Sequence, residues 1–327
     1  MDPIRAAVPC RACLSGEDLD WLGGGRSVSL ALGLMTTVET RPGPGPAPRE
    51  GAEDGWQREV WAFLRERLPG LGPRPPAVTV HSEAPAASGL SSSTARIVAL
   101  FRAFADASLG GRRVGDATIT QWAYEFEFAV FNGGGMDHLA VVEGGALLLD
   151  GRERGLPVVR DRLELPERWR VIVVDSGTRK DTRHHIRDVR AQLASGDPAL
   201  AAYRAATDEA SGRVWAALRH RDLAELGAAM TAAHEAMRDH QRMSTPLLEE
   251  LRAVALRSAG LPLKLSGAGG GGALVGICPA DEAAETAARL ARALCVSHPG
   301  ARVVPTTAAP GTRREPVPVT GGQRKGS

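Results

Sequence analysis

The feature that most constrains this chain is a stretch of small residues that runs directly into a strongly periodic helix. Residues 88–95 read Ser-Gly-Leu-Ser-Ser-Ser-Thr-Ala, and apolar residues at helical spacing predict a helix over residues 94–109. Small side chains let the backbone approach a ligand closely, and Gly89 permits unusual dihedral angles. Because backbone N–H groups and the positive end of the helix dipole converge there, the segment suits a phosphate group. A serine-rich helix cap is the alternative interpretation.

The composition is that of an ordinary globular protein. The chain has 327 residues, of which 43% are hydrophobic and 24% are charged, and its formal net charge is +2. This is enough to build a sizeable core in one large domain or two smaller ones. A charge balance this even gives no general attraction to nucleic acid or a membrane. The apolar stretches are also shorter than the ~20 residues of a membrane helix. Because residues 1–5 also lack the apolar core of a signal peptide, we expect a cytoplasmic protein.

Helical and extended patterns are mixed along the chain, which predicts an α+β fold. Further helices are expected at residues 56–68, 120–131, 185–193, 200–218, 223–238, 246–259 and 282–295. Strands are expected at residues 8–14, 27–38, 77–81, 146–149, 170–175, 263–266, 273–278 and 301–304. A polar stretch near residues 152–167 predicts a boundary between an N-terminal domain, 1–160, and a C-terminal domain, 161–305. Residues 306–327 are rich in Pro, Gly and charge and are predicted to be disordered.

A second glycine-rich segment, residues 264–273, reads Lys-Leu-Ser-Gly-Ala-Gly-Gly-Gly-Gly-Ala. It formally contains the G-x-G-x-x-G pattern of dinucleotide-binding proteins, but that function requires a helix after the glycines. Here a predicted strand follows, which disfavours an oxidoreductase that binds nicotinamide or flavin. Four consecutive glycines lose much chain entropy on ordering, so we expect a loop packed against a ligand or another loop.

Two acidic segments are candidates for a functional site. Glu17, Asp18 and Asp20 lie together in a loop flanked by glycines. Carboxylates accept hydrogen bonds from hydroxyl groups, so the cluster suits a neutral polyhydroxylated substrate better than an anion. An exposed acidic turn is the alternative. The second segment carries Glu125 and Glu127, which cannot face the same way on a helix, and Asp137, which follows the glycines at 133–135.

Cysteines and histidines offer weaker metal signals. Cys10-x-x-Cys13 could form half of a zinc site, but no second pair of matching spacing follows, so we favour apolar thiols. His184 and His185 begin a stretch rich in Arg and Asp, for which a solvated helix face is the expected structure.

Taken in order, these segments resemble the GHMP kinase superfamily over roughly residues 8–305. Residues 85–95 resemble its P-x-x-x-G-L-G-S-S-A loop, with Ser91 where the family usually has Gly, and residues 263–272 resemble its C-terminal glycine motif. Residues 16–21, Gly-Glu-Asp-Leu-Asp-Trp, resemble the G-E-H-T-D-Y of the galactokinase branch, with Asp18 replacing His and Trp21 replacing Tyr. The resemblance implies an N-terminal ribosomal protein S5-like α/β domain and a C-terminal ferredoxin-like α/β domain with extra helices.

The resemblance also implies roles for individual residues. Asp137 matches the catalytic Asp, with Arg11 expected beside it, and Ser93 and Glu125 match the Mg²⁺ ligands. The expected ATP-binding residues are Pro85, Ser88, Gly89, Leu90, Ser91, Ser92, Ser93 and Thr94. The expected substrate-binding residues are Glu17, Asp18, Asp20, Gly267, Gly269 and Gly270.

The function implied by the resemblance is ATP- and Mg²⁺-dependent phosphoryl transfer to a hydroxyl, the anomeric one, of a sugar or sugar-like acceptor. One alternative is a kinase of the same superfamily that acts on a cyclitol or another non-sugar alcohol. A second is a catalytically inactive member that senses a sugar or ATP. No nucleic acid or membrane partner is expected, and the protein is expected to be a monomer or a homodimer.

Overall fold

The fold is known from a computed structural model, which describes residues 4–44, 55–108, 114–131, 133–179, 182–311 and 313–316. Its helices are α1 (Gly55–Arg67), α2 (Ser92–Ser108), α3 (Asp116–Phe131), α4 (Met136–Glu143), α5 (Thr182–Ser195), α6 (Pro198–His220), α7 (Leu223–Gln241), α8 (Pro246–Ala259) and α9 (Ala283–Ser297). Its strands are β1 (Ile4–Ser15), β2 (Arg26–Pro44), β3 (Pro76–Ser82), β4 (Ala146–Asp150), β5 (Val158–Leu163), β6 (Trp169–Asp175), β7 (Lys264–Leu265), β8 (Ala273–Pro279), β9 (Arg302–Thr306) and β10 (Arg313–Pro316). The α+β class predicted from the sequence is confirmed.

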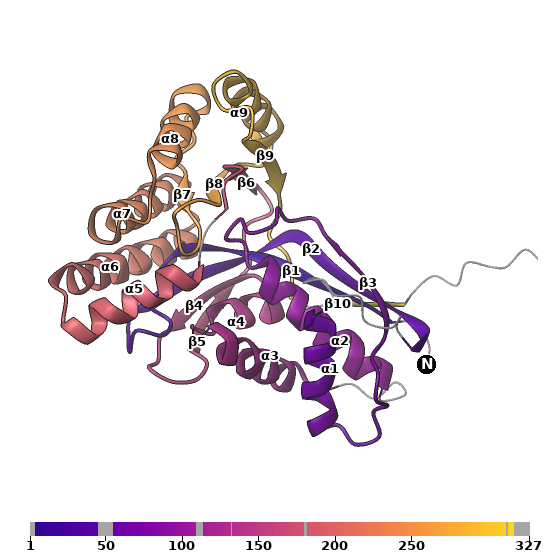
Figure 1. Cartoon of the computed structure of the whole chain (residues 1–327). Helices are drawn as coiled ribbons and strands as arrows, with labels where there is room; N and C mark the ends of the chain where they lie inside the picture. The colour runs from indigo at the N-terminus through magenta and orange to yellow at the C-terminus, as the bar shows by residue number, and fades with distance from the viewer. Residues whose placement is uncertain are drawn as a thin grey trace, which may run out of the picture.

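The first sheet has the strand order β10-β1-β2-β4-β5, and its paired neighbours are antiparallel. The long strand β2 pairs with β4 through its first residues and with β3 through its second half. Helices α1, α2, α3 and α4 gather on one side of the sheet (Figure 1), whereas α6 contacts β1 and β2 from the C-terminal part of the chain.

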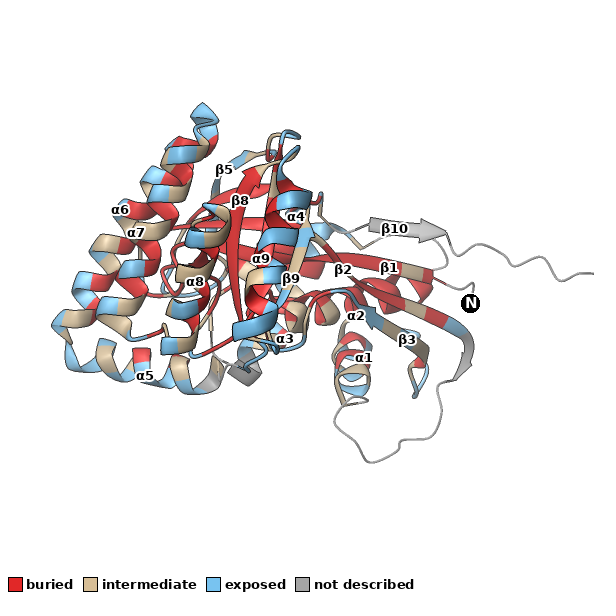
Figure 2. Ribbon diagram, turned by 90° about the horizontal axis from the view of Figure 1, so that it is seen from above, coloured by how far each residue is buried: buried red, intermediate tan, exposed pale blue. Residues whose placement is uncertain are grey.

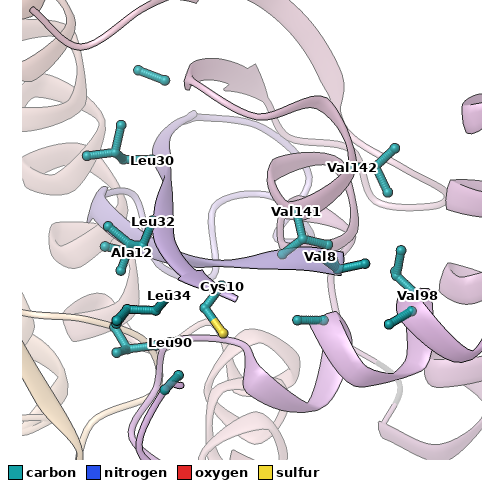
Figure 3. Packing of buried hydrophobic residues seen from close by; sticks show 14 of the residues in the cluster. Val8, Cys10, Ala12, Leu30, Leu32, Leu34, Leu90, Val98, Val141 and Val142 are labelled. Carbon is teal, nitrogen blue, oxygen red and sulfur yellow. The ribbon is translucent and has the colours of Figure 1, made fainter. Parts of the chain in front are cut away.

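Strand alternation decides which residues of β1 enter the core and which face the helices on its other side. Val8, Cys10 and Ala12 are fully buried and belong to the main apolar cluster, together with Leu90 of the loop before α2 and Val98 of α2 itself. Val141 and Val142 of α4 belong to the same cluster, on the side of Val8 and Val98 in Figure 3. Because successive residues of a strand point to opposite faces, Arg11 projects away from this cluster.

The second sheet has the order β7-β8-β6-β9 and is antiparallel throughout. Strands β6 and β8 are almost completely buried, as their mainly apolar sequences predict, and β8 can be followed in Figure 2. Helix α7 contacts β7 and β8, and α9 contacts β6 and β9. The chain passes from the first sheet to the second between Leu163, the end of β5, and Trp169, the start of β6. The domain boundary predicted after residue 160 falls inside β5.

The C-terminal segment differs from the sequence-based expectation. Residues 306–327 were expected to be disordered, but Ala308 and Pro310 form β-bridges to Leu32 and Gly144, and β10 pairs with Ile4–Ala7 at the edge of β1. The free edge of β1 supplies backbone partners that a composition rich in Pro and Gly does not reveal. Residues 317–327 of that expected tail lie outside the described residues.

The sequence also gave no prediction of α4 and β5, which are short. Among the described residues, none of the helices combines the length and the apolar character that crossing a bilayer requires.

Candidate active site

A cleft lies where the two halves of the chain meet. It is bordered by the loop after β1, the loop before α2, the end of α3, the start of α4, the first turn of α5 and the loop after β7. Most of the predicted site residues converge there, although Glu17 and Gly267 alone are 250 positions apart in sequence (Arg11, Glu17, Asp18, Asp20, Gly89, Ser91, Ser92, Ser93, Thr94, Asp137 and Gly267). The cleft is therefore the candidate active site.

Asp137 occupies the first turn of α4 and is held by two donors. Its Oδ1 accepts a hydrogen bond from Nε of Arg11 at 2.7 Å and forms an ion pair with Nη2 at 2.5 Å. Its Oδ2 accepts a hydrogen bond from the Ser91 hydroxyl at 2.5 Å. Burial opposes the charge on Arg11, but Asp137, Cys13 and Glu17 together outweigh it and raise the pKa of the guanidinium. This pairing holds the Asp137 carboxylate in a defined position in the cleft.

The loop before α2 has the backbone of an anion-binding turn. Ala87, Gly89 and Ser91 have φ values of 56°, 84° and 57°, a left-handed conformation that glycine adopts readily and other residues seldom do. Ser91 immediately precedes α2, whose first N–H groups therefore open toward the cleft. Ser92 and Ser93, which were predicted to bind ATP, border the cleft.

Three of the predicted ATP-binding residues help to build the loop and do not line the cleft. Leu90 is fully buried in the core. Ser88 donates a hydrogen bond to the carbonyl of Pro85, and its own carbonyl accepts one from the N–H of Ala273 at 2.7 Å. Pro85, Ser88 and Leu90 therefore shape the loop without lining the cleft.

The predicted Mg²⁺ carboxylate, Glu125, lies on the wrong face of α3. Its side chain is 41% exposed, and it pairs with Arg67 at the surface at 3.3 Å. Glu127 faces the cleft instead: both of its oxygens accept from the Thr94 hydroxyl, at 3.1 and 2.9 Å, and its Oε2 lies 2.8 Å from Nε2 of His138. Two residues of helix turn a side chain by about 200°, so only one of the two glutamates can border the cleft.

Mg²⁺ prefers oxygen ligands and usually keeps several waters, needing one or two carboxylates beside substrate phosphates. Within the part of the chain that the structure describes, no three His, Cys, Asp or Glu side chains form a ready-made metal cage. Glu127, with the hydroxyls of Ser93 and Thr94 at the start of α2, is a donor set of the kind that Mg²⁺ takes when phosphate supplies further oxygens.

Glu17 is bound to a buried lysine that the sequence did not single out. Nζ of Lys264 contacts Oε1 of Glu17 at 2.5 Å and also donates to the carbonyls of Cys13 and Leu265. Lys264 is fully buried, and the Glu17 side chain is only 3% exposed. Among the described residues, Oε2 of Glu17 has no hydrogen-bond partner although it is buried. An unpartnered buried oxygen bordering a cleft is an open acceptor for a ligand donor.

The other two acids of the loop are also buried, which rules out the exposed acidic turn. Asp20 accepts a hydrogen bond from the N–H of Met136 at 3.0 Å, and burial raises the pKa of Asp20 to about 7. Gly134 permits this approach, because a Cβ at that position would overlap the Asp20 carboxylate. Asp18 contacts His185 of α5 at 2.7 Å and accepts from the indole N–H of Trp21 at 3.2 Å.

The second glycine-rich loop packs against the loop before α2. Packing against another loop was one of the two arrangements expected for it. A Cβ on Gly272 would lie 2.6 Å from the carbonyl oxygen of Ser88, so only glycine fits. Gly267 borders the cleft and donates to Glu17 at 3.3 Å. Gly269 and Gly270, which were predicted to bind substrate, contact Met243 between α7 and α8 and do not line the cleft.

Sequence reasoning missed two residues that line the cleft, His138 and His185, and the buried Lys264 that pairs with Glu17. The isolated lysine beside the glycine motif is the one signal that could have found Lys264, since Lys is scarce in this chain. His185 was expected on a solvated helix face, and its neighbour His184 is indeed 64% exposed, but the His185 side chain is only 12% exposed.

Comparison with known proteins places the chain in a family. The model described as "GHMP kinases N terminal domain" matches residues 57–145, and "GHMP kinases C terminal" matches residues 215–296. A galactokinase of Actinobacillus succinogenes is 30% identical over 269 residues, which cover 70% of this chain and 67% of the relative. The chain belongs to the GHMP kinase superfamily. A galactokinase of Mycobacterium bovis is 29% identical over 366 residues, covering 94% of this chain and 98% of the relative.

Solved structures show the same fold. The galactokinase of Lactococcus lactis complexed with galactose gives a TM-score of 0.77 at 16% identity and covers 95% of both chains. The mevalonate kinase of L. major in complex with R-mevalonate gives 0.75 at 21% identity, covering 93% of this chain and 95% of that one. This GHMP kinase therefore has the two-domain fold predicted from its motifs and is an ATP-dependent kinase.

Proposed function

We propose that this GHMP kinase transfers the γ-phosphoryl group of Mg-ATP to a hydroxyl of a neutral sugar, and that this hydroxyl is the anomeric one. The observation that carries the proposal is the Glu17 carboxylate: Glu17 lines the cleft, and its buried Oε2 has no hydrogen-bond partner among the described residues. A hydroxyl donor satisfies this oxygen, whereas the carboxylate of an acid such as mevalonate would be repelled by it. The galactokinases among its relatives support the same acceptor class.

The remaining groups suit phosphoryl transfer, which depends mostly on positioning and charge neutralisation. The loop before α2 would hold the β- and γ-phosphates on backbone N–H groups. Glu127, with Ser93 and Thr94, would hold Mg²⁺, which when bound offsets the charge of the phosphates. We place the metal carboxylate at Glu127 because it, and not Glu125, borders the cleft.

Asp137 would orient the acceptor hydroxyl and accept its proton. The hydroxyl oxygen forms the new bond to the γ-phosphorus, the bond between that phosphorus and the bridging oxygen breaks, and ADP leaves with the electron pair. Arg11, bound to Oδ1, keeps the carboxylate ionised, so a proton from the hydroxyl can pass to it. Glu17 and Asp20 would bind the other hydroxyls of the acceptor.

A cyclitol is the second candidate acceptor, because its ring hydroxyls would meet the same carboxylates. The test is release of ADP from Mg-ATP against hexoses, pentoses, uronic acids, heptoses, cyclitols, homoserine and mevalonate, with phosphorus NMR of the product. A neutral sugar that gives an acid-labile anomeric phosphate is the expected result. Activity with a cyclitol alone would mean that the protein is a kinase whose acceptor is a cyclitol and not a sugar. Activity only with mevalonate or homoserine would overturn the proposed acceptor class.

Asp137→Asn is the matched control for this assay. The amide cannot accept the proton, so we expect turnover to fall by more than a hundredfold while ATP binding, measured by calorimetry, stays within about twofold. Retention of most of the turnover would remove the proposed role of Asp137 as base.

A further inference from the structure

Asp18 and His185 form a pair between the two halves of the chain, 167 positions apart in sequence. Nε2 of His185, on the first turn of α5, lies 2.7 Å from Oδ2 of Asp18, in the loop after β1. The two side chains are 12% and 8% exposed, and both border the cleft that contains Asp137. The pair is therefore buried at the active site and does not lie on the outer surface of α5.

The position of Asp18 is fully determined by its surroundings. Its Oδ1 accepts from the indole N–H of Trp21 at 3.2 Å, and its Oδ2 faces His185. Its backbone has a φ of 67°, a left-handed conformation that few residues other than glycine, asparagine and aspartate adopt. Both carboxylate oxygens are thus engaged, which makes Asp18 a poorer acceptor for a substrate hydroxyl than Glu17, whose Oε2 is unpartnered within the described chain.

His185 contributes an imidazole ring to the cleft wall, whereas Asp18 contributes a carboxylate. A carboxylate beside an imidazole fixes the orientation of the ring and decides which ring nitrogen carries a proton. Ile186 and Thr182, on the same turn of α5, also border the cleft, so this turn forms one wall of it. An oriented imidazole in that wall can discriminate between acceptors that present a hydroxyl there and acceptors that do not.

We propose that His185 is a specificity-determining residue that hydrogen-bonds an acceptor hydroxyl other than the one phosphorylated, and that Asp18 is the residue that positions it. The inference rests on the proposed phosphorylation of a polyhydroxylated acceptor and adds a second fixed contact to it. Glu17 and His185 belong to different halves of the chain, so together they would require an acceptor whose hydroxyls reach both sides of the cleft.

The test compares wild type, His185→Gln and Asp18→Asn with the acceptor found in the panel and its monodeoxy analogues. His184→Gln is the matched control, because His184 is the adjacent residue of α5 and its side chain is 64% exposed. We expect His185→Gln to raise the acceptor KM at least tenfold with the ATP KM within about twofold, and Asp18→Asn to give a smaller rise. We also expect one deoxy analogue to bind wild type more weakly but His185→Gln equally well.

An unchanged acceptor KM in His185→Gln, equal rises in the acceptor and ATP KM, or deoxy penalties that are the same in both proteins would overturn the inference. Failure of the proposed function looks different, because wild type itself would then phosphorylate no polyhydroxylated acceptor.

Discussion

The Ser91 hydroxyl donates a 2.5 Å hydrogen bond to Oδ2 of Asp137, the carboxylate that Arg11 holds through its other oxygen. Ser91 adopts a φ of 57°, where glycine would be less strained. The contact with Asp137 is an interaction that can offset the cost of this conformation.

Ser91→Ala should therefore slow turnover more than it weakens ATP binding. Loss of a hydrogen bond to a charged group is worth roughly 1.5 to 3 kcal/mol, so we expect kcat to fall by a factor of ten or more. Ser91→Gly is the control, since it also relaxes the backbone. An unchanged kcat in the alanine variant would mean that the hydroxyl plays no part.

Glu127→Gln and Glu125→Gln are a matched pair on one helix. Glu127 borders the cleft and contacts Thr94, so its variant should need at least tenfold more Mg²⁺ for half-maximal activity. Glu125 pairs with Arg67 at the surface, where a salt bridge contributes about 0 to 1 kcal/mol, so its variant should behave as wild type. Titration of activity with Mg²⁺ at fixed ATP measures both. The opposite order would return the metal site to Glu125.

Lys264→Met should destabilise the protein because it leaves the Glu17 charge buried without its cation. Breaking a buried pair from one side typically costs about 3 to 5 kcal/mol, measured here by urea unfolding. Lys264→Met combined with Glu17→Gln should recover much of this stability. The acceptor KM of the double variant should nevertheless exceed that of wild type, because the Glu17 carboxylate is gone. Arg213→Met, in an exposed ion pair with Glu225, is the control and should change the free energy of unfolding by less than about 1 kcal/mol. Equal effects of the two single changes would contradict the buried pair.

Asp20 makes the stability of the folded state depend on pH. Burial raises the pKa of Asp20 from 3.8 to about 7. Between about pH 4 and pH 7 the folded protein holds a proton that the unfolded chain releases, so stability falls as the pH rises through this window.

Asp20→Asn removes this titration. The free energy of unfolding of wild type should fall relative to that of the variant between about pH 4 and pH 7, by up to about 4 kcal/mol, as measured by urea unfolding across the range. Asp281→Asn, a change at an exposed position, should follow the wild-type curve. Parallel curves for wild type and Asp20→Asn would show that Asp20 titrates near its ordinary pKa.

Much of the site could be predicted from the sequence because its motifs are local. Two of these motifs, the turn before α2 and the glycines at 267–272, need backbone conformations that glycine adopts readily. The third, at residues 17–20, places three carboxylates within four residues. Each constraint acts within a few residues of sequence. Strand alternation in β1 likewise fixes that Cys10 and Arg11 face opposite sides.

Tertiary structure decided which of several equivalent residues face the cleft. Helical geometry separates Glu125 from Glu127, but only the packing of α3 beside α2 and α4 shows that Glu127 is the inner one. Asp18 meets His185, and Glu17 meets Lys264, across 167 and 247 positions of sequence. Local patterns determine secondary structure and turns because their forces act between near neighbours, whereas a buried charge selects its partner from whatever residues the folded chain brings within a few ångströms.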